Sequence, residues 1–360
     1  MTGLRAAIVT AALSGAGLVT AAATPARTPQ SAAAPAAPSR PASPGHVETL
    51  RAVGALPAEI VGEFREPLGF TRLTSGQELV FDRRGHAVYA ITADRRASRK
   101  IVAIGGEDGR VIEPTAFDAD PGGTFVVADA PNGRERVQIF TSDGRRAGGF
   151  TLPGRATPRV TLGSLSLSGI GTLQYTGRSV VISQPETGGL MTEYGLAGTP
   201  VRTIGRLRAT GHEPDRELHL ALNAGIPLKD ADGGYWFVFL AGEPAFSRFD
   251  AAGTLVFHRV IQGRELDPVV SALPSTWPRR DIDGTEIPLV SPTIRTAALS
   301  PDGRLWISFV VPYTYVFDGL GEKVRTVQFV AAGLAAPNSL SFPSSGRLLV
   351  TPGCFEFDAR

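Results

Sequence analysis

The chain has 360 residues, 42% of them hydrophobic and 19% charged, with a formal net charge of +2 at pH 7. Its length is sufficient for one or two packed domains, and its 42 glycines and 28 prolines are typical of many short strands separated by turns. The net charge is small and no basic run supports the electrostatic footprint of a nucleic-acid binder, so charge alone does not indicate a partner.

Residues 1–23 have the pattern of a signal peptide. Arg5 supplies a positive charge, residues 6–19 are apolar, and three alanines at 21–23 form a small-residue cleavage site. The apolar stretch is too short and too rich in small residues for a stable membrane span. We therefore predict cleavage after about Ala23 and a secreted or periplasmic protein; retention of the segment as an anchor is the alternative.

Residues 24–58 are predicted to be a disordered Ala/Pro-rich spacer. Up to residue 45 the segment consists almost entirely of Ala, Pro, Ser, Thr and Arg, which cannot bury enough apolar surface to offset the entropy of ordering. The remaining residues, 59–360, are predicted to form one domain.

A repeating unit of short strands fills this domain. Its turn glycines are Gly85, Gly123, Gly177, Gly233, Gly303 and Gly346. The shortest spacing between them, about 38 residues, fits one four-stranded propeller blade, and longer spacings fit a blade with an inserted loop. The strand after the turn is hydrophobic on both faces, for example at residues 235–239, as expected when each sheet is packed between two neighbours.

The ends of the domain indicate how a ring would close. The last unit, from residue 339, has three strands, and residues 60–64 stand before the first full unit as an unpaired strand. Pairing 60–64 with 355–358 would remove the exposed sheet edges. The predicted fold class is therefore all-β: a six-bladed β-propeller whose ring is closed by an N-terminal strand that completes the last blade. A seventh blade would have to lie in the insertion at 262–292, whose prolines argue against it.

One unit carries a family resemblance. Residues 117–129 read Phe-Asp-Ala-Asp-Pro-Gly-Gly-Thr-Phe-Val-Val-Ala-Asp, and they are followed by Asn132, Arg134 and the run 137–144. This pattern resembles an NHL repeat, of the type found in secreted bacterial six-bladed propellers. The resemblance implies the fold of nearly the whole mature chain. It implies little about function, because NHL-like propellers include RNA binders, protein scaffolds and lyases.

Candidate binding residues lie near the starts of three predicted innermost strands. A propeller binds at one end of its central channel, where these strands begin. Asn223, Arg295 and Asn338 lie there, and their amide and guanidinium groups could hold a carboxylate, a sugar or a water molecule. The alternative is that they satisfy backbone groups around the channel.

A second set of candidates lies in and near the insertion. It consists of Trp277, Arg279, Tyr313 and Tyr315. Aromatic and arginine side chains on loops are typical of an interface or a carbohydrate platform, which would require the aromatic rings to share one exposed face. Alternatively, Trp277 would fold the insertion back onto the domain.

No metal or nucleophile motif accompanies these residues. His212 and His219 are seven positions apart, which matches no metal-binding signature. The only cysteine, Cys354, has no base in its local sequence and is predicted to be a small buried apolar residue. We therefore predict no metal ligands and no cofactor.

The sequence favours an exported, non-catalytic binding or scaffolding propeller over an enzyme. Its partner would be a protein, a peptide or an envelope glycan at the channel mouth, and the protein would be a monomer. The alternative is a metal-dependent, lactonase-like hydrolase or lyase, with its site in the channel and Ca²⁺ as the ion it would hold. Nucleic-acid binding is disfavoured by the export signal and by the lack of a basic aromatic patch.

Overall fold

The structure is a computed structural model that describes residues 46–154, 158–162, 165–168, 170–282, 284–344 and 346–359. The predicted signal peptide and the spacer up to residue 45 lie outside the described residues. None of the helices in the described part has the length and apolar character needed to span a membrane.

Four sheets have four antiparallel strands each, in chain order. Two of them consist of β2 (Pro67–Arg72), β3 (Glu78–Asp82), β4 (Ala87–Ile91) and β5 (Ser98–Val102), and of β6 (Ala116–Asp120), β7 (Thr124–Asp129), β8 (Arg136–Thr141) and β9 (Arg146–Thr151). The other two consist of β12 (Leu173–Tyr175), β13 (Ser179–Ser183), β14 (Gly189–Gly195) and β15 (Pro200–Arg206), and of β16 (Gly225–Lys229), β17 (Tyr235–Phe239), β18 (Ala245–Phe249) and β19 (Leu255–Val260).

The second strand of a sheet is covered on both faces. Every residue of β3, β13 and β17 is buried, which confirms the interpretation of the apolar runs. The core lies between neighbouring sheets: Trp236 and Phe246 pack in one cluster with Ile307 and Phe317, which belong to a different sheet. Burying one such large side chain stabilises the fold by about 1.5–3 kcal/mol.

Turn glycines make the tight connections between first and second strands. Gly233 has φ 84° and Gly303 has φ 78°, a conformation that side chains other than glycine rarely adopt. Gly85, predicted to precede the second strand of its sheet, lies instead between β3 and β4, the second and third strands, where a Cβ would lie 2.1 Å from a carboxylate oxygen of Asp82. That carboxylate accepts the backbone N–H of Gly85 at 3.0 Å, so close approach rather than φ requires the glycine.

The largest sheet has eight strands and overturns the predicted six-bladed arrangement. It contains β22 (Ile294–Leu299), β23 (Leu305–Phe309), β24 (Thr314–Phe317) and β25 (Lys323–Val330), together with β26 (Ser339–Ser341), β27 (Arg347–Thr351) and β28 (Phe355–Asp358). The eighth strand, β1 (Val47–Ala55), pairs in parallel with β25 and antiparallel with β28. The described strands thus form an all-β propeller of four separate blades and one continuous eight-stranded sheet. The large sheet is continuous because β1 joins strands β22–β25 to strands β26–β28.

The predicted closing strand is also wrong. Residue 60 lies in helix α1 (Ala58–Val61), and the strand that pairs with β28 is β1, within the segment predicted to be spacer. Ile60 is apolar because it packs in a core cluster with Phe70 and Tyr89. Phe64 contacts the ring of Tyr89, with 5.0 Å between the ring centroids. These residues are therefore apolar because they cover the first sheet, and not because they form a strand.

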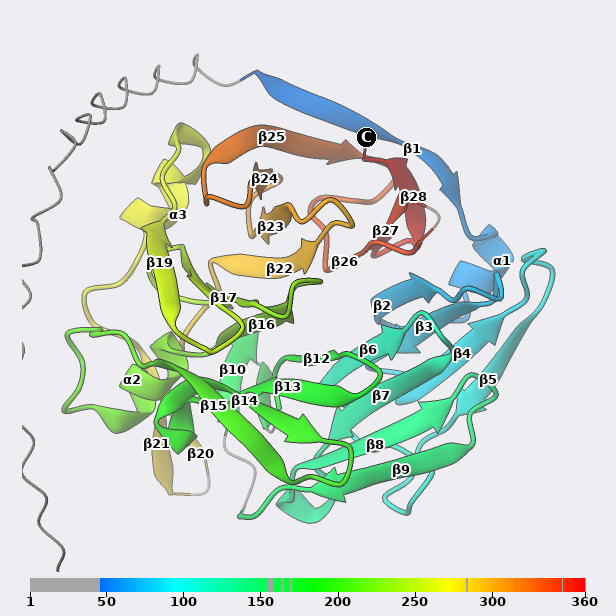
Figure 1. Ribbon diagram of the computed structural model, residues 1–360, viewed down its shortest axis with the longest axis horizontal. Coiled ribbons are helices and arrows are strands. Elements are labelled where there is room, and N and C mark those ends of the chain that lie inside the picture. Colours follow the sequence, from blue (N-terminus) through cyan, green and yellow to red (C-terminus); the bar gives the residue numbers. More distant parts are fainter. Residues whose placement is uncertain are drawn as a thin grey trace, which may run out of the picture. The chain divides into compact units, whose positions relative to one another are not determined.

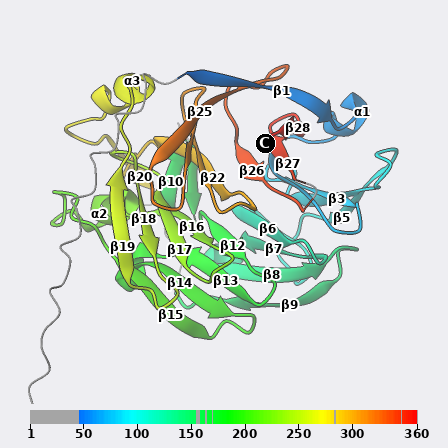
Figure 2. The same cartoon turned by 45° about the horizontal axis from the view of Figure 1, so that its top comes forward.

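The first strand of each four-stranded sheet and the two end strands of the eight-stranded sheet, β22 and β26, contact one another in a closed order. β2 contacts β6 and β26, β12 contacts β6 and β16, and β22 contacts β16 and β26. Figure 1 shows the sheets arranged around these strands, and Figure 2 shows β1 beside β25, its neighbour in the middle of the large sheet. All six strands line one central cavity.

The remaining elements are short. They are the 3-10 turns η1 (Pro131–Gly133), η2 (Pro185–Thr187) and η3 (Arg264–Leu266), helices α2 (Arg216–Leu222) and α3 (Asp267–Ser271), and the hairpins β10–β11 (Pro158–Leu162, Leu165–Ser168) and β20–β21 (Arg279–Ile282, Thr285–Pro288). The described residues of the 262–292 insertion thus form a helical turn, a helix and a hairpin, and no further blade.

Candidate functional site

The central cavity has a volume of about 770 Å³. It is lined by the six strands that contact one another in closed order: β2, β6, β12, β16, β22 and β26. This volume lies within the range of about 300–1,000 Å³ that is typical of small-molecule sites. Its charged lining residues among those described are Glu66, Arg72, Arg83, Asp118, Lys229, Asp230 and Arg295. What the cavity can bind depends on which of these charges are already neutralised by a neighbour.

Arg295 reaches the cavity through a β-bulge. Ile294 pairs with Phe309 and Thr296 with Ser308, which leaves Arg295 as the extra residue between them. A bulge re-aims the side chain at that position. Arg295 is exposed, and its guanidinium donates to the amide oxygen of Asn338 at 2.7 Å.

Within the described part of the chain, Arg295 forms this one side-chain hydrogen bond and no ion pair. A guanidinium has five N–H donors, so several stay available to a ligand. The backbone N–H of Asn338 donates to the carbonyl of Thr351 at 2.8 Å, which fixes the residue at the start of β26. Arg295 and Asn338 therefore form a pre-positioned site for an anionic group.

Two other arginines in the cavity are neutralised. The Arg83 guanidinium makes two hydrogen bonds to the carboxylate of Glu66, at 2.6 and 2.9 Å. Arg72 donates to Glu78 at 2.6 Å and to Glu356 at 2.7 Å. Burial by itself would raise the pKa of Glu356, but hydrogen bonds from Arg95 and Arg72 outweigh it and lower that pKa. The contacts of Arg72 and Arg95 with Glu356 connect the first sheet to β28 of the eight-stranded sheet, whereas Arg83 pairs only with Glu66.

Lys229 and Asp230 also have partners outside the cavity. The Lys229 ammonium donates to Glu193 at 2.8 Å, and Asp230 lies 3.6 Å from the guanidinium of Arg248. Glu193 is 4% exposed and accepts three further hydrogen bonds, from side chains of β13, β15 and β17. Neither Lys229 nor Asp230 presents an unbalanced charge to a ligand.

Asp118 is the exception among the carboxylates. Its two oxygens accept the backbone N–H groups of Ala119 at 2.9 Å and Tyr175 at 2.7 Å, and no cation of the described residues pairs with it. Burial of the carboxyl group raises the pKa of Asp118 to about 7, against the opposing effect of these two hydrogen bonds, and the charge of Asp120 adds to the rise. A carboxyl with this pKa in a cavity is suited to binding a cation or to proton transfer.

Of the sequence-predicted site residues, the structure brings Arg295 and Asn338 together but places Asn223 elsewhere. Asn223 is fully buried at the C-terminal end of α2. Its amide accepts the backbone N–H of Arg208 at 2.9 Å and donates to the carbonyl of His219 at 3.0 Å. For this residue the alternative interpretation, hydrogen bonding to backbone groups, describes the structure.

The predicted aromatic platform has no exposed face. Trp277 is 9% exposed and packs with Leu218 and Val290, which folds the insertion onto the domain. Tyr315 is fully buried, and its hydroxyl donates to Glu265 at 2.6 Å.

The two remaining members of this set do not form a site either. Tyr313 is half-buried against a core cluster. Arg279 is ion-paired with Asp215, next to α2.

Asp118 was not singled out as a candidate residue by the sequence, where it stands only within the run 117–129. Its environment could not be predicted locally, because whether a cation pairs with its carboxylate depends on residues that are distant in the chain. Within the part of the chain that is described, no group of three or more His, Cys, Asp and Glu side chains is arranged to hold a metal ion. Cys354 is buried, as predicted, and burial raises the pKa of its thiol.

Comparisons with known proteins find no matching family model and no matching curated protein. Among solved structures, a streptogramin B lyase aligns with a TM-score of 0.48 and 10% identity over 80% of this chain and 76% of the other. A virginiamycin B lyase from Staphylococcus aureus aligns with a TM-score of 0.48 and 12% identity over 79% and 77%. The hydrazine synthase of Kuenenia stuttgartiensis aligns with a TM-score of 0.48 and 12% identity over 80% and 74%. The propeller assignment depends on the strand pairing described above.

Proposed function

We propose that this chain is an exported binding propeller that holds a carboxylate-bearing ligand, the end of a peptide or an acidic glycan, in its central cavity. The observation that carries the proposal is Arg295, a cation placed in the cavity by a β-bulge and left without an ion-pair partner among the described residues. An arginine–carboxylate pair is often bidentate, which gives both strength and orientation.

Asn338 makes the site selective. Its oxygen accepts one N–H of Arg295, its amide nitrogen donates no hydrogen bond to any described residue, and the residue lines the same cavity. A ligand carboxylate bound to Arg295 would therefore find an additional donor beside it. Hydrogen bonds to charged groups contribute about 1.5–3 kcal/mol each, so loss of the guanidinium is expected to weaken binding at least tenfold.

Matched neutral and anionic probes test this proposal by isothermal titration calorimetry. The first pair is N-acetylpentaglycine and its C-terminal amide; the second is a galacturonic acid disaccharide and its methyl ester. At least one acid should bind about tenfold or more tightly than its neutral match, and Arg295→Gln should remove the difference. Arg99→Gln, which removes an exposed arginine of β5, is the control and should change nothing. Equal binding of acid and neutral probe in both pairs would overturn the proposal.

A second candidate, a hydrolase or lyase with its site in the same cavity, is favoured by Asp118. A carboxyl group with a pKa near neutrality is suited to general acid–base catalysis. The test is hydrolysis of a lactone such as dihydrocoumarin, with and without added Ca²⁺. Turnover that is lost in Asp118→Asn would favour this candidate over the binding protein, the comparison with and without Ca²⁺ would show whether the ion takes part, and absence of turnover would count against the candidate.

A further inference from the structure

The two unbalanced charges of the cavity lie on opposite walls. Arg295 is on β22, which contacts β16 and β26, whereas Asp118 is on β6, which contacts β2 and β12. The two strands share no neighbour in the closed order, so they face each other across the cavity. A ligand that spans the cavity from Arg295 therefore ends at the wall that carries Asp118.

Asp118 has the capacity to bind a cation at that wall. A carboxylate can accept about four hydrogen bonds, and the two backbone N–H groups use two of these positions. The backbone donors also fix the orientation of the carboxylate, so a ligand does not need to order it. Every other charged lining residue among those described, apart from Arg295, is engaged by a residue of opposite charge.

We infer that Asp118 binds the ammonium group of a ligand whose carboxylate is bound by Arg295, so that the ligand is zwitterionic: an amino acid or a short peptide with free amino and carboxyl ends. This inference rests on the proposed function, and it narrows the ligand class. It disfavours an acidic glycan, which carries no ammonium group, and an internal segment of a folded protein, which carries neither free end.

The cavity itself limits the length of the ligand. Its volume of about 770 Å³ is that of a site for a small molecule and not for a folded partner. An extended peptide rises about 3.3 Å per residue, so a ligand of a few residues is long enough to reach from one wall of the cavity to the other. Glycine oligomers from diglycine to pentaglycine are therefore suitable probes, because they vary only in the separation of the two charges.

The experiment compares each glycine oligomer with its N-acetyl derivative at pH 7.5, where the carboxyl group of Asp118 and the α-amino group of the oligomer are each charged in more than half of the molecules. Acetylation removes the ammonium charge and keeps the carboxylate. We expect it to weaken binding of the best oligomer at least tenfold in the wild-type protein. In Asp118→Asn the free oligomer should bind as weakly as the acetylated one, and acetylation should have no further effect.

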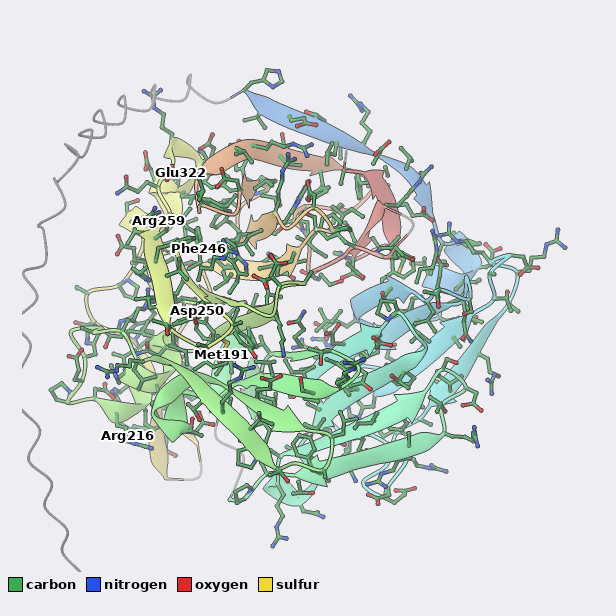
Figure 3. All side chains as sticks on the ribbon, in the orientation of Figure 1. Met191, Arg216, Phe246, Asp250, Arg259 and Glu322 are labelled. Atoms are coloured by element: carbon green, nitrogen blue, oxygen red, sulfur yellow. The ribbon has the colours of Figure 1, made fainter. Side chains whose placement is uncertain are left out.

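Asp250→Asn is the matched control. Asp250, labelled in Figure 3, accepts two backbone N–H groups as Asp118 does, but it is exposed in the turn between β18 and β19. It does not line the cavity, so this variant should keep the full effect of acetylation.

The outcomes separate the inference from the proposed function. If acetylation has no effect while the acid still binds more tightly than its amide, the ammonium site is refuted and the carboxylate site stands. If no oligomer binds at millimolar concentration, the inference is likewise refuted, and the galacturonic acid pair decides the proposed function. If acetylation weakens binding equally in wild type and Asp118→Asn, the ammonium group is bound elsewhere and the assignment to Asp118 fails.

Discussion

Replacing Asp118 by asparagine should change how the stability of the protein depends on pH. In the folded protein the pKa of this carboxyl is raised from 3.8 to about 7, chiefly by burial. Well below pH 3.8 the carboxyl group of Asp118 is protonated in both the folded and the unfolded state, so its ionisation does not affect the free energy of unfolding. Between pH 4 and 7 the unfolded chain releases the proton and the folded chain retains it, so the free energy of unfolding falls as the pH rises. Asparagine does not titrate and avoids this loss.

The size of the effect follows from the shift of the pKa. About three pKa units at 1.36 kcal/mol each give a loss of about 4 kcal/mol between pH 4 and pH 8. This figure is an upper bound, because the residue is only partly buried and solvent screens an accessible charge. A bound ammonium group would stabilise the ionised carboxyl group of Asp118. Binding would therefore offset the stability that the folded protein loses when this group ionises.

Urea denaturation of wild type and Asp118→Asn at pH 4.5 and pH 8 measures the effect. The other titrating groups are common to both proteins, so the difference between the two free energies isolates Asp118. The variant should gain stability relative to wild type on going from pH 4.5 to pH 8. Asp250→Asn should show no such gain, because Asp250 is exposed. A wild-type-to-variant difference that stays constant within about 1 kcal/mol would refute the reasoning.

Two further predictions concern the scaffold. Glu193→Gln should lower the free energy of unfolding by about 3 kcal/mol at pH 7; burial opposes ionisation, but hydrogen bonds led by that of Lys229 hold the pKa of Glu193 at about 2. The stabilisation is present above pH 4.5 and is lost toward pH 2, so a urea-denaturation difference that did not shrink at pH 3 would contradict this account. Deleting β1 (Val47–Ala55) should expose the edges of β25 and β28 and cause aggregation, seen by size-exclusion chromatography. A chain beginning at residue 46 is the control, and a soluble, cooperatively unfolding deletion variant would show that β1 is dispensable.

The strands that could be predicted are those whose environment imposes a pattern on neighbouring residues. Every residue of β17 (Tyr235–Phe239) is buried, so the strand is an uninterrupted apolar run. The turn before it needs a positive φ, which Gly233 supplies. Both signals are local, and a repeat of local signals was sufficient to identify an all-β propeller.

The closing strand could not be predicted, because it lacks such a pattern. Burial alternates along β1 from Thr49 to Ala55, but only Leu50 is fully buried, and the next inward residues, Ala52 and Gly54, are too small to give an apolar signal that distinguishes a strand from a spacer. Ile60 and Phe64 showed a stronger apolar signal, but a short apolar segment reads the same in a helix that covers a core as in a strand. Which segment joins β25 to β28 is decided by edge hydrogen bonds, and these depend on the backbone rather than on side-chain type.

The candidate site likewise contains residues that the sequence could predict and contacts that it could not. Arg295 and Asn338 could be proposed from the sequence, because position at the start of an innermost strand is a consequence of the repeat. Asn223 has the same position in sequence, yet α2 precedes β16, and the Asn223 amide bonds the backbone of His219 in α2 and of Arg208 before it. The sequence by itself determined the repeated sheets and the kinds of groups at their inner ends. Only the tertiary structure decided which charges lack a partner, because ion pairs such as that of Lys229 with Glu193 form between residues distant in the chain.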